Sequence, residues 1–203
     1  MSEEIIFYHN PQSRASMVHL MLEECGANYR IVPVDFARGD NKTPEFLKLN
    51  PMGKLPTIVH RGVVVTETPA IIAYLADLHP QANLAPPIGD PARGTWYRWL
   101  FFGGSCFEPA LLDTATKRPA PDPGTAGYGS YEQVVNALKT ALTPGPWLLG
   151  EQFTAADVYV GSEINWAMMF GAPGLKGEKV FDDYVARLTA RPAYKRTLAE
   201  ATA

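Results

Sequence analysis

A turn near the N-terminus gathers side chains that can donate hydrogen bonds. The segment YHNPQSRAS follows the apolar run IIF and leads into MVHLMLEE, which has the character of a helix. Its donors are the hydroxyls of Tyr8, Ser13 and Ser16 and the amide of Asn10. A redox protein built on such a strand-to-helix turn would carry a pair of cysteines there, whereas this chain has Ser13 and Arg14. The turn therefore favours hydrogen-bond chemistry over chemistry at a protein thiol.

The first eighty residues, which must position this turn, alternate between the periods of strand and helix. IIFY predicts a short strand, and Val18, Met21, Leu22 and Cys25 then follow helical spacing until Gly26 ends the helix. YRIVPVDF predicts a second strand, whose proline favours an edge position or a bulge.

Two cap-plus-proline pairs mark the next helices. Thr43 precedes the proline of TPEFLKLN, and Thr68 precedes the proline that leads into AIIAYLADL, so each threonine is predicted to be a helix N-cap. LPTIVH and VVVTE flank Arg61 and Gly62, which is typical of a β-hairpin. The predicted order of this half is βαβαββα.

The second half contains helical patterns and no strand pattern. Capping-box spacing appears at Ser130 with Gln133 and at Thr154 with Asp157. A segment rich in proline and glycine, HPQANLAPPIGDPARG, separates the halves. The predicted division is a first domain over 1–78, a linker over 79–90 and an all-helical domain over 91–203.

Length and charge exclude several classes of protein. The 203 residues, 46% of them hydrophobic, can bury one large core or two modest ones. A formal net charge of −3 gives no electrostatic reason to expect nucleic acid or an anionic membrane as a partner. No segment approaches the roughly 18 apolar residues of a membrane helix, and the acidic start does not resemble a secretory signal. We therefore expect a soluble, cytoplasmic protein.

The cysteines and histidines form no metal-ligand pattern. Cys25 and Cys106 belong to no CxxC motif, and the four histidines are scattered, so no metal site is expected. Cys25 is predicted to be the buried end of the first helix. Cys106 lies in an aromatic-rich segment, where it is either a small packing residue or part of a cleft.

Three motifs together resemble the cytosolic glutathione transferase family, in its bacterial type with a serine-type active-site turn. They are NPMGKLPT and TETPAIIAYL in the first half and GEQFTAADVYVG in the second, and the resemblance covers essentially the whole chain. It implies an α/β thioredoxin-like N-terminal domain followed by an all-α helical-bundle domain. It also implies a homodimer and a role in detoxification.

The resemblance assigns glutathione-binding roles to Lys54, Leu55, Pro56, Glu67 and Thr68. Leu55-Pro56 before a strand is the family's mark, with the proline cis and the Leu55 backbone paired with the cysteine of glutathione. Lys54 would contact the glycine carboxylate, with Lys42 as a candidate assistant. The γ-glutamyl carboxylate would lie on a cap at Thr68, and its ammonium would face Glu67.

The opening turn would then activate the glutathione thiol. A thiol with a pKa near 8.5 is only a few per cent thiolate at pH 7. Lowering the pKa by two units needs about 2.7 kcal/mol, and a hydrogen bond to a charged acceptor supplies about 1.5–3 kcal/mol. Ser13 is the predicted donor. A plain N-cap role for Ser13 and donation by Tyr8, Asn10, Ser16 or a backbone N–H remain alternatives.

The predicted reaction is attack of this thiolate on a hydrophobic electrophile. Four aromatic residues of the second half together suggest an apolar wall for its pocket, and for each of them a place in the interdomain or interhelical core is the alternative: Trp96, Trp99, Phe102 and Phe107. The alternatives on the same fold are a glutathione-dependent disulfide reductase or peroxidase and a non-catalytic interaction module.

Overall fold

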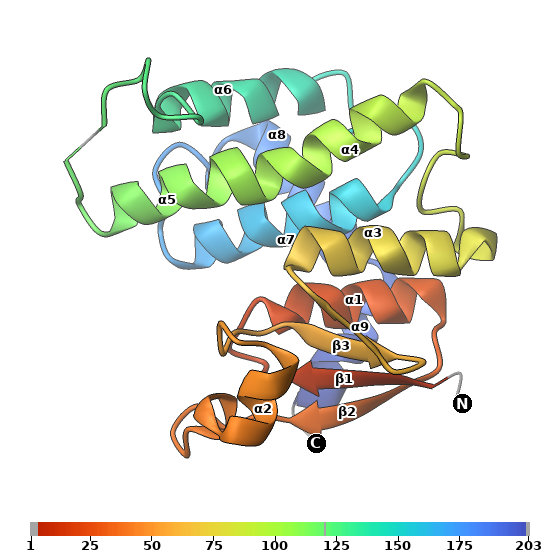
Figure 1. Cartoon of the computed structure of the whole chain (residues 1–203). Coiled ribbons are helices and arrows are strands. Elements are labelled where there is room, and N and C mark those ends of the chain that lie inside the picture. The colour runs from red at the N-terminus through yellow and green to blue at the C-terminus, as the bar shows by residue number, and fades with distance from the viewer. Residues whose placement is uncertain (1–3, 120, 202–203) are drawn as a thin grey trace. The chain divides into compact units, whose positions relative to one another are not determined.

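Strand β1 (Ile5–His9) is paired on both edges, and this pairing builds the sheet of the N-terminal unit. Its side chains alternate between buried and partly exposed, as expected for a strand whose two faces differ. β2 (Tyr29–Pro33) runs parallel to β1, and β3 (Thr57–His60) runs antiparallel to it. β4 (Val63–Thr66) follows β3 through a hairpin, so the strand order is β2-β1-β3-β4 (Figure 1).

The structure is a computed structural model that describes residues 4–119 and 121–201. Its contacts define two compact units. The first comprises the described residues up to Ala82 together with the C-terminal helix α9 (Pro192–Ala201), and the second comprises Asn83–Arg191.

Helices cover both faces of the sheet in the first unit. α1 (Ala15–Cys25) packs against α3 (Thr68–Leu78), and the ring of its His19 lies 6.0 Å from that of Phe7 on β1. α2 (Pro44–Leu49) lies on the opposite face, where Phe46 meets Tyr8 edge-on at 5.5 Å. This βαβαββα arrangement is the predicted thioredoxin-like fold.

Several local predictions are confirmed. Gly26 ends α1 in the left-handed region, at φ 60°, and Thr43 caps α2 by accepting a hydrogen bond from the Phe46 N–H. The hairpin turn places both Arg61 and Gly62 at positive φ. The proline of β2 lies on an edge strand.

The predicted cap at Thr68 is wrong by one position. Thr68 is the first residue of α3, and Glu67 is the N-cap because its carbonyl accepts the first helical bond, from the Ile71 N–H at 2.9 Å. Glu67 adopts φ 67° and ψ 119°, and its side chain makes no capping bond. Glu67 is the one residue between the end of β4 at Thr66 and the start of α3 at Thr68.

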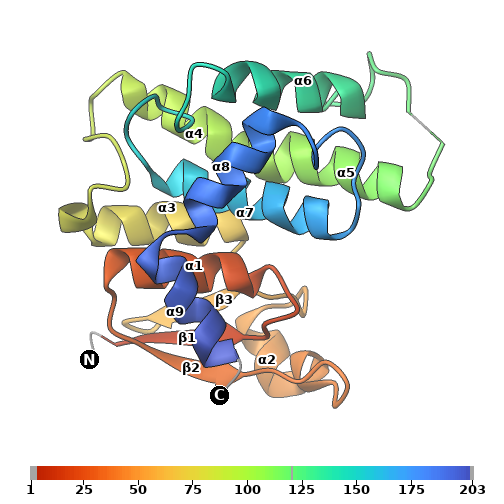
Figure 2. The same ribbon diagram turned by 180° about the vertical axis from the view of Figure 1, so that it is seen from behind.

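Helix α9 belongs with the first unit, whereas the sequence pattern predicts it in the helical domain. It packs on α1, as the view from behind shows (Figure 2). Arg196 pairs with the Glu23 carboxylate and donates from Nη2 to the Glu23 carbonyl at 3.1 Å. The Tyr29 hydroxyl also donates to this carboxylate, at 2.7 Å. A charge pair between residues distant in sequence leaves no local pattern, so it could not be predicted.

The second unit is helical in its described residues, as predicted. Its elements are α4 (Ala92–Phe102), a π-helical segment (Gly103–Phe107), α5 (Glu108–Ala115), α6 (Tyr131–Leu142), α7 (Ala155–Met169) and α8 (Lys179–Thr189). Both predicted capping boxes are present, at the starts of α6 and α7. None of the described helices has the length and apolar character needed to cross a membrane.

The carboxylate of Asp157 organises the start of α7. It accepts bonds from the Leu148 N–H at 2.8 Å, the Thr154 N–H at 2.9 Å, the Thr154 hydroxyl at 3.1 Å and the Tyr184 hydroxyl at 2.9 Å. Burial raises the pKa of Asp157 to about 6, against the opposing effect of these hydrogen bonds. One side chain therefore ties a loop, a helix start and α8 together.

Most of the predicted aromatic wall is core. Trp96, Trp99 and Phe107 are buried within the second unit, and Phe102 is half-buried. The exposed aromatic side chains of α4 are instead Tyr97 and Phe101. The helical period of α4 turns Trp96 and Trp99 inward, and for these two residues and Phe107 the alternative of a core position holds.

We expect Asp157→Ala to lower the free energy of unfolding by about 3 kcal/mol or more, because it takes the acceptor from four buried donors. Urea unfolding at pH 7 measures this loss. Asp183→Ala is the control, since its exposed carboxylate pairs with Lys179 on the surface of α8 and should cost less than about 1 kcal/mol. Equal losses in the two variants would contradict the central role of Asp157.

Candidate functional site

Three loops of the first unit converge on one cavity of about 370 Å³. They are the turn after β1, the loop after β2 and the loop before β3. The lining residues are Gln12, Ser13, Arg14, Phe36, Asn41, Lys42, Gly53, Lys54 and Leu55. The structure therefore brings together Ser13, Lys54 and Leu55 of the predicted site, along with Lys42.

The turn after β1 is organised by Asn10. Its side-chain Nδ2 donates to the Val34 carbonyl at 2.8 Å, and its Oδ1 accepts from the Gln12 N–H at 2.9 Å. Its backbone carbonyl accepts from the Ser13 N–H at 3.1 Å. Asparagine commonly forms such local turns, and here its amide group also bridges two loops.

The Ser13 hydroxyl lies on the cavity wall between two backbone partners. It donates to the Asn10 carbonyl at 2.7 Å and accepts from the Ala15 N–H at 3.1 Å. Ser13 thus satisfies one N–H of the first turn of α1, although Arg14 is the formal N-cap residue. The Ser13 side chain therefore both stabilises the start of α1 and lines the cavity.

The alternative donors have other positions. Tyr8 packs against Phe46. Ser16 is exposed and donates to the Ser13 carbonyl at 3.0 Å. The Asn10 amide is already hydrogen-bonded to the Val34 carbonyl and the Gln12 N–H. Of these four predicted donors, Ser13 alone is among the described residues that line the cavity.

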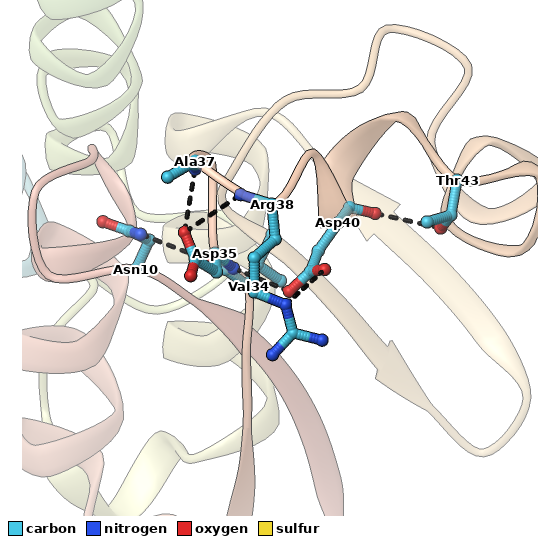
Figure 3. A network of polar contacts seen from close by, with 7 residues as sticks. All are labelled: Asn10, Val34, Asp35, Ala37, Arg38, Asp40 and Thr43. Carbon is cyan, nitrogen blue, oxygen red and sulfur yellow. Dashed lines mark hydrogen bonds and ion pairs between the residues drawn. The ribbon is translucent and has the colours of Figure 1, made fainter.

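The loop after β2 is held by its own carboxylates, as Figure 3 shows. Asp35 Oδ1 accepts from the Ala37 N–H at 2.8 Å, and Asp40 Oδ2 accepts from the Asp35 N–H at 3.0 Å. Arg38 lies 3.7 Å from Asp40, and the Thr43 hydroxyl donates to the Asp40 carbonyl. This network gives a defined shape to the loop that contributes three residues to the cavity.

The loop before β3 is positioned by the buried amide of Asn50. Its Nδ2 donates to the Lys54 carbonyl at 2.9 Å, and its Oδ1 accepts from the Met52 N–H at 3.0 Å. The Leu55-Pro56 peptide bond is cis, as the resemblance implied. Leu55 is largely buried on the cavity wall, Pro56 is buried behind it, and the Lys54 side chain is exposed.

Glu67 and Thr68 lie at the start of α3 and are not among the residues that line the cavity. Glu67 is exposed and Thr68 is largely buried. A glutamate at φ 67° occupies a region that non-glycine residues rarely adopt, and such conformations concentrate at functional sites.

The electrostatics of the cavity favour an anionic ligand. Arg14, Lys42 and Lys54 line it, and no acidic residue does so in the described part of the chain.

Two titratable groups outside the cavity lining have pKa values shifted by burial. Burial, and secondarily Glu24, raises the pKa of the Cys25 thiol to about 12, so Cys25 is no nucleophile. Burial, reinforced by His19, lowers the pKa of His9 to about 4. His9 is therefore neutral at pH 7.

Metal ligation has no support among the residues that the structure describes, which contain no group of three His, Cys, Asp or Glu able to hold an ion. Cys106 lies in the π-helical segment of the second unit, half-exposed, with its sulfur 3.7 Å from the Ser105 hydroxyl. The cavity itself is lined by the Ser13 hydroxyl and by the cationic side chains of Arg14, Lys42 and Lys54.

Comparison with known proteins decides the family. Residues 3–77 match the family model of the glutathione S-transferase N-terminal domain. A zeta-class glutathione S-transferase of Euphorbia esula is 38% identical over 163 residues, which cover 74% of this chain and 70% of that protein. The chain belongs to the glutathione S-transferase family.

Two further relatives of this transferase-family chain are a disulfide oxidoreductase and a transferase-family member solved with glutathione. The disulfide-bond oxidoreductase YfcG of Escherichia coli (strain K12) is 28% identical over 174 residues, 79% of each chain. A glutathione transferase family member from Pseudomonas fluorescens pf-5, solved with two glutathione bound, superposes with a TM-score of 0.83. It is 27% identical, and the match covers 97% of this chain and 92% of that one.

Three residues that shape the loops of this transferase-family site were not among the predicted site residues. Asn41 and Asn50 act through their amides, and Gly53 adopts φ 61° beside them. The Asn41 Nδ2 donates to the Gly53 carbonyl at 2.8 Å and so joins two loops of the cavity. The local signal that could have pointed to Asn50 and Gly53 is the turn-forming composition of NPMG, a motif that does not include Asn41.

Gly53→Ala should destabilise the protein by about 1–3 kcal/mol more than Gly39→Ala. A Cβ on Gly53 would lie 2.9 Å from the backbone oxygen of Asn41, and the residue has positive φ. Gly39 also has positive φ, at 76°, but a Cβ added there would meet nothing within 4 Å, so this variant reports backbone strain alone. Urea unfolding of both variants separates close packing from strain, and equal losses would contradict the close approach.

Proposed function

We propose that this protein is a glutathione transferase in which Ser13 stabilises the thiolate of bound glutathione. The observation that carries the proposal is the Ser13 hydroxyl on the wall of a cationic cavity, at the start of α1. The family assignment supports a glutathione-dependent enzyme, and the relative from Pseudomonas fluorescens pf-5 binds glutathione.

Glutathione would bind in an extended conformation across the first unit. Its glycine carboxylate would pair with Lys54, assisted by Lys42, because both cations line the cavity. Its cysteine would pair with the backbone of Leu55, beside the cis bond to Pro56.

The γ-glutamyl end would lie at the start of α3. Helix N-termini carry N–H groups without helical partners and a partial positive charge, so Thr68 and its neighbours suit a carboxylate. The exposed carboxylate of Glu67 suits the ammonium group beside it. The positive φ of Glu67 would then serve to aim this side chain.

Activation requires the Ser13 hydroxyl to exchange one acceptor for another. Its bond to the Asn10 carbonyl has a net value of about 0.5–1.5 kcal/mol, whereas a bond to a thiolate contributes about 1.5–3 kcal/mol. The difference, about 1 kcal/mol, lowers the thiol pKa by about one unit. This is less than the two units expected when Ser13 is considered without a partner, because the hydroxyl already has an acceptor.

The reaction then follows from the thiolate. The thiol proton passes to solvent, and a sulfur lone pair forms a C–S bond to the electrophilic carbon. The leaving group departs with the electrons of the bond that breaks. Cys25 takes no part, because its thiol is buried and protonated at neutral pH.

Ser13→Ala should raise the pKa of bound glutathione by about one unit while changing its Kd less than about threefold. The reason is that the lost hydrogen bond forms only to the thiolate. Ultraviolet difference titration of the thiolate measures this pKa. Tyr8→Phe is the matched control and should leave the pKa in place, since Tyr8 packs against Phe46. A shift in Tyr8→Phe and none in Ser13→Ala would reverse the assignment.

Lys54→Gln should weaken glutathione binding about two- to fivefold at low salt, because an exposed ion pair contributes about 0.2–1 kcal/mol. Isothermal titration measures the Kd. Lys48→Gln, on the exposed side of α2 and outside the cavity lining, should bind as the native protein does. With the glycyl ethyl ester of glutathione the effect of Lys54→Gln should disappear; an unchanged effect would show that Lys54 does not contact the glycine carboxylate.

Disulfide reduction is a second candidate, favoured by the similarity to YfcG. Glutathione thiolate would attack one sulfur of a small disulfide and release a thiolate. A second glutathione would resolve the mixed disulfide, yielding oxidised glutathione. Turnover of bis(2-hydroxyethyl) disulfide in the absence of conjugating activity would favour this candidate over the transferase.

A further inference from the structure

We infer that Asn10 is a positioning residue for thiol activation, whose side-chain amide orients the backbone carbonyl that holds the Ser13 hydroxyl. The inference rests on the proposed role of Ser13. In this role Asn10 does not contact the substrate. It acts through Ser13 and is not itself the donor to the thiolate.

Both ends of the Asn10 amide are used, in opposite directions. Nδ2 donates to the Val34 carbonyl at 2.8 Å, across to the chain that leaves β2, and Oδ1 accepts from the Gln12 N–H at 2.9 Å, within the turn. The Val34 N–H donates in return to the His9 carbonyl at 2.8 Å. Val34 is buried, so this double connection lies on a fixed part of the fold.

The carbonyl oriented in this way controls Ser13. It accepts from the Ser13 N–H at 3.1 Å and from the Ser13 hydroxyl at 2.7 Å, which uses both lone pairs of a carbonyl oxygen. The Ala15 N–H then donates to the same hydroxyl oxygen at 3.1 Å. When the hydroxyl hydrogen rotates from the Asn10 carbonyl toward a sulfur in the cavity, the Ala15 N–H still holds Oγ, so the oxygen itself need not move.

Asparagine suits this position because the two bonds need one donor and one acceptor on a short side chain. An aspartate could accept from the Gln12 N–H but could not donate to the Val34 carbonyl. Serine could form the local turn and would not reach Val34. Alanine would lose both bonds.

Asn10 also joins the Ser13 turn to the loop that forms another wall of the cavity. Val34 directly precedes Asp35, whose N–H and carboxylate belong to the network that shapes residues 35–43 (Figure 3). Phe36, Asn41 and Lys42 of the cavity lie in that loop. The distance between the Ser13 wall and this wall is therefore set in part by one side-chain amide.

The test is a double-mutant cycle on the full chain, with glutathione as the probe and two readouts, its Kd and the pKa of its bound thiol. Asn10→Ala should raise the pKa by about half a unit or more toward the Ser13→Ala value, with Kd changed less than about threefold. In the Ser13→Ala background, Asn10→Ala should cause no further shift, because the two residues act on the same hydrogen bond. An unchanged pKa in the single variant, or an additive shift in the double variant, would overturn the inference.

Two further variants keep the result decisive. Asn10→Ser retains a local acceptor for the Gln12 N–H and should fold even if Asn10→Ala does not; its pKa should lie between the native and Ser13→Ala values. Asn41→Ala removes another amide tether of the same cavity, the bond to the Gly53 carbonyl, and leaves the bonds of Asn10 and Ser13 in place. It should weaken binding and leave the thiol pKa unchanged; a pKa shift as large as that of Asn10→Ala would overturn the inference by indicating a general loosening of the cavity.

Failure of the inference can be told apart from failure of the proposed function. If Ser13→Ala shifts the pKa and the Asn10 variants do not, Asn10 has no positioning role and the Ser13 proposal stands. If the native protein binds no glutathione, or if Ser13→Ala leaves the pKa unchanged, both are overturned.

Discussion

The pairing of β1 with β2 on one edge and β3 on the other is the constraint on which the candidate site depends. β1 and β2 run parallel, so both chains leave the sheet at the same end, and antiparallel β3 enters at that end. The turn after β1, the loop after β2 and the loop before β3 must therefore meet. The cavity is the space among these three loops, and its lining residues fall between 12 and 55.

Side-chain amides convert this topology into a defined site. Asn10 connects the first loop to the second, Asn41 connects the second to the third, and Asn50 shapes the third internally. Each amide supplies a donor at a fixed distance from its backbone, and together they satisfy polar groups of loops that have no ladder to join. Rigid loops let a weak interaction, such as one hydroxyl hydrogen bond, act on a single reacting atom.

The helical unit uses the same physics for stability. Asp157 gathers a loop N–H, a helix N-cap and a tyrosine of α8 around one buried carboxylate. Burial disfavours the charged form of the Asp157 carboxylate and raises its pKa, and the hydrogen bonds to the carboxylate oppose this effect. Stability in this unit thus depends on a polar centre within an apolar core.

Elements whose causes are local could be predicted from the order of the amino acids. The cap at Thr43, the left-handed end of α1 at Gly26, the hairpin at Arg61-Gly62 and the capping boxes of α6 and α7 depend on residues within one or two turns of each other. The motif around Leu55-Pro56 was likewise visible through its resemblance to one family, and the cis bond agrees with it.

Which residues of these elements meet depends on the folded chain. The N-cap of α3 is Glu67 in place of the expected Thr68, and the tryptophans of α4 are buried. The place of α9 depends on Arg196 reaching Glu23, and the position of Ser13 depends on Asn10 reaching Val34. Such contacts join residues far apart along the chain, so no local pattern of spacing encodes them, and they exist only once the sheet has set the distances between loops.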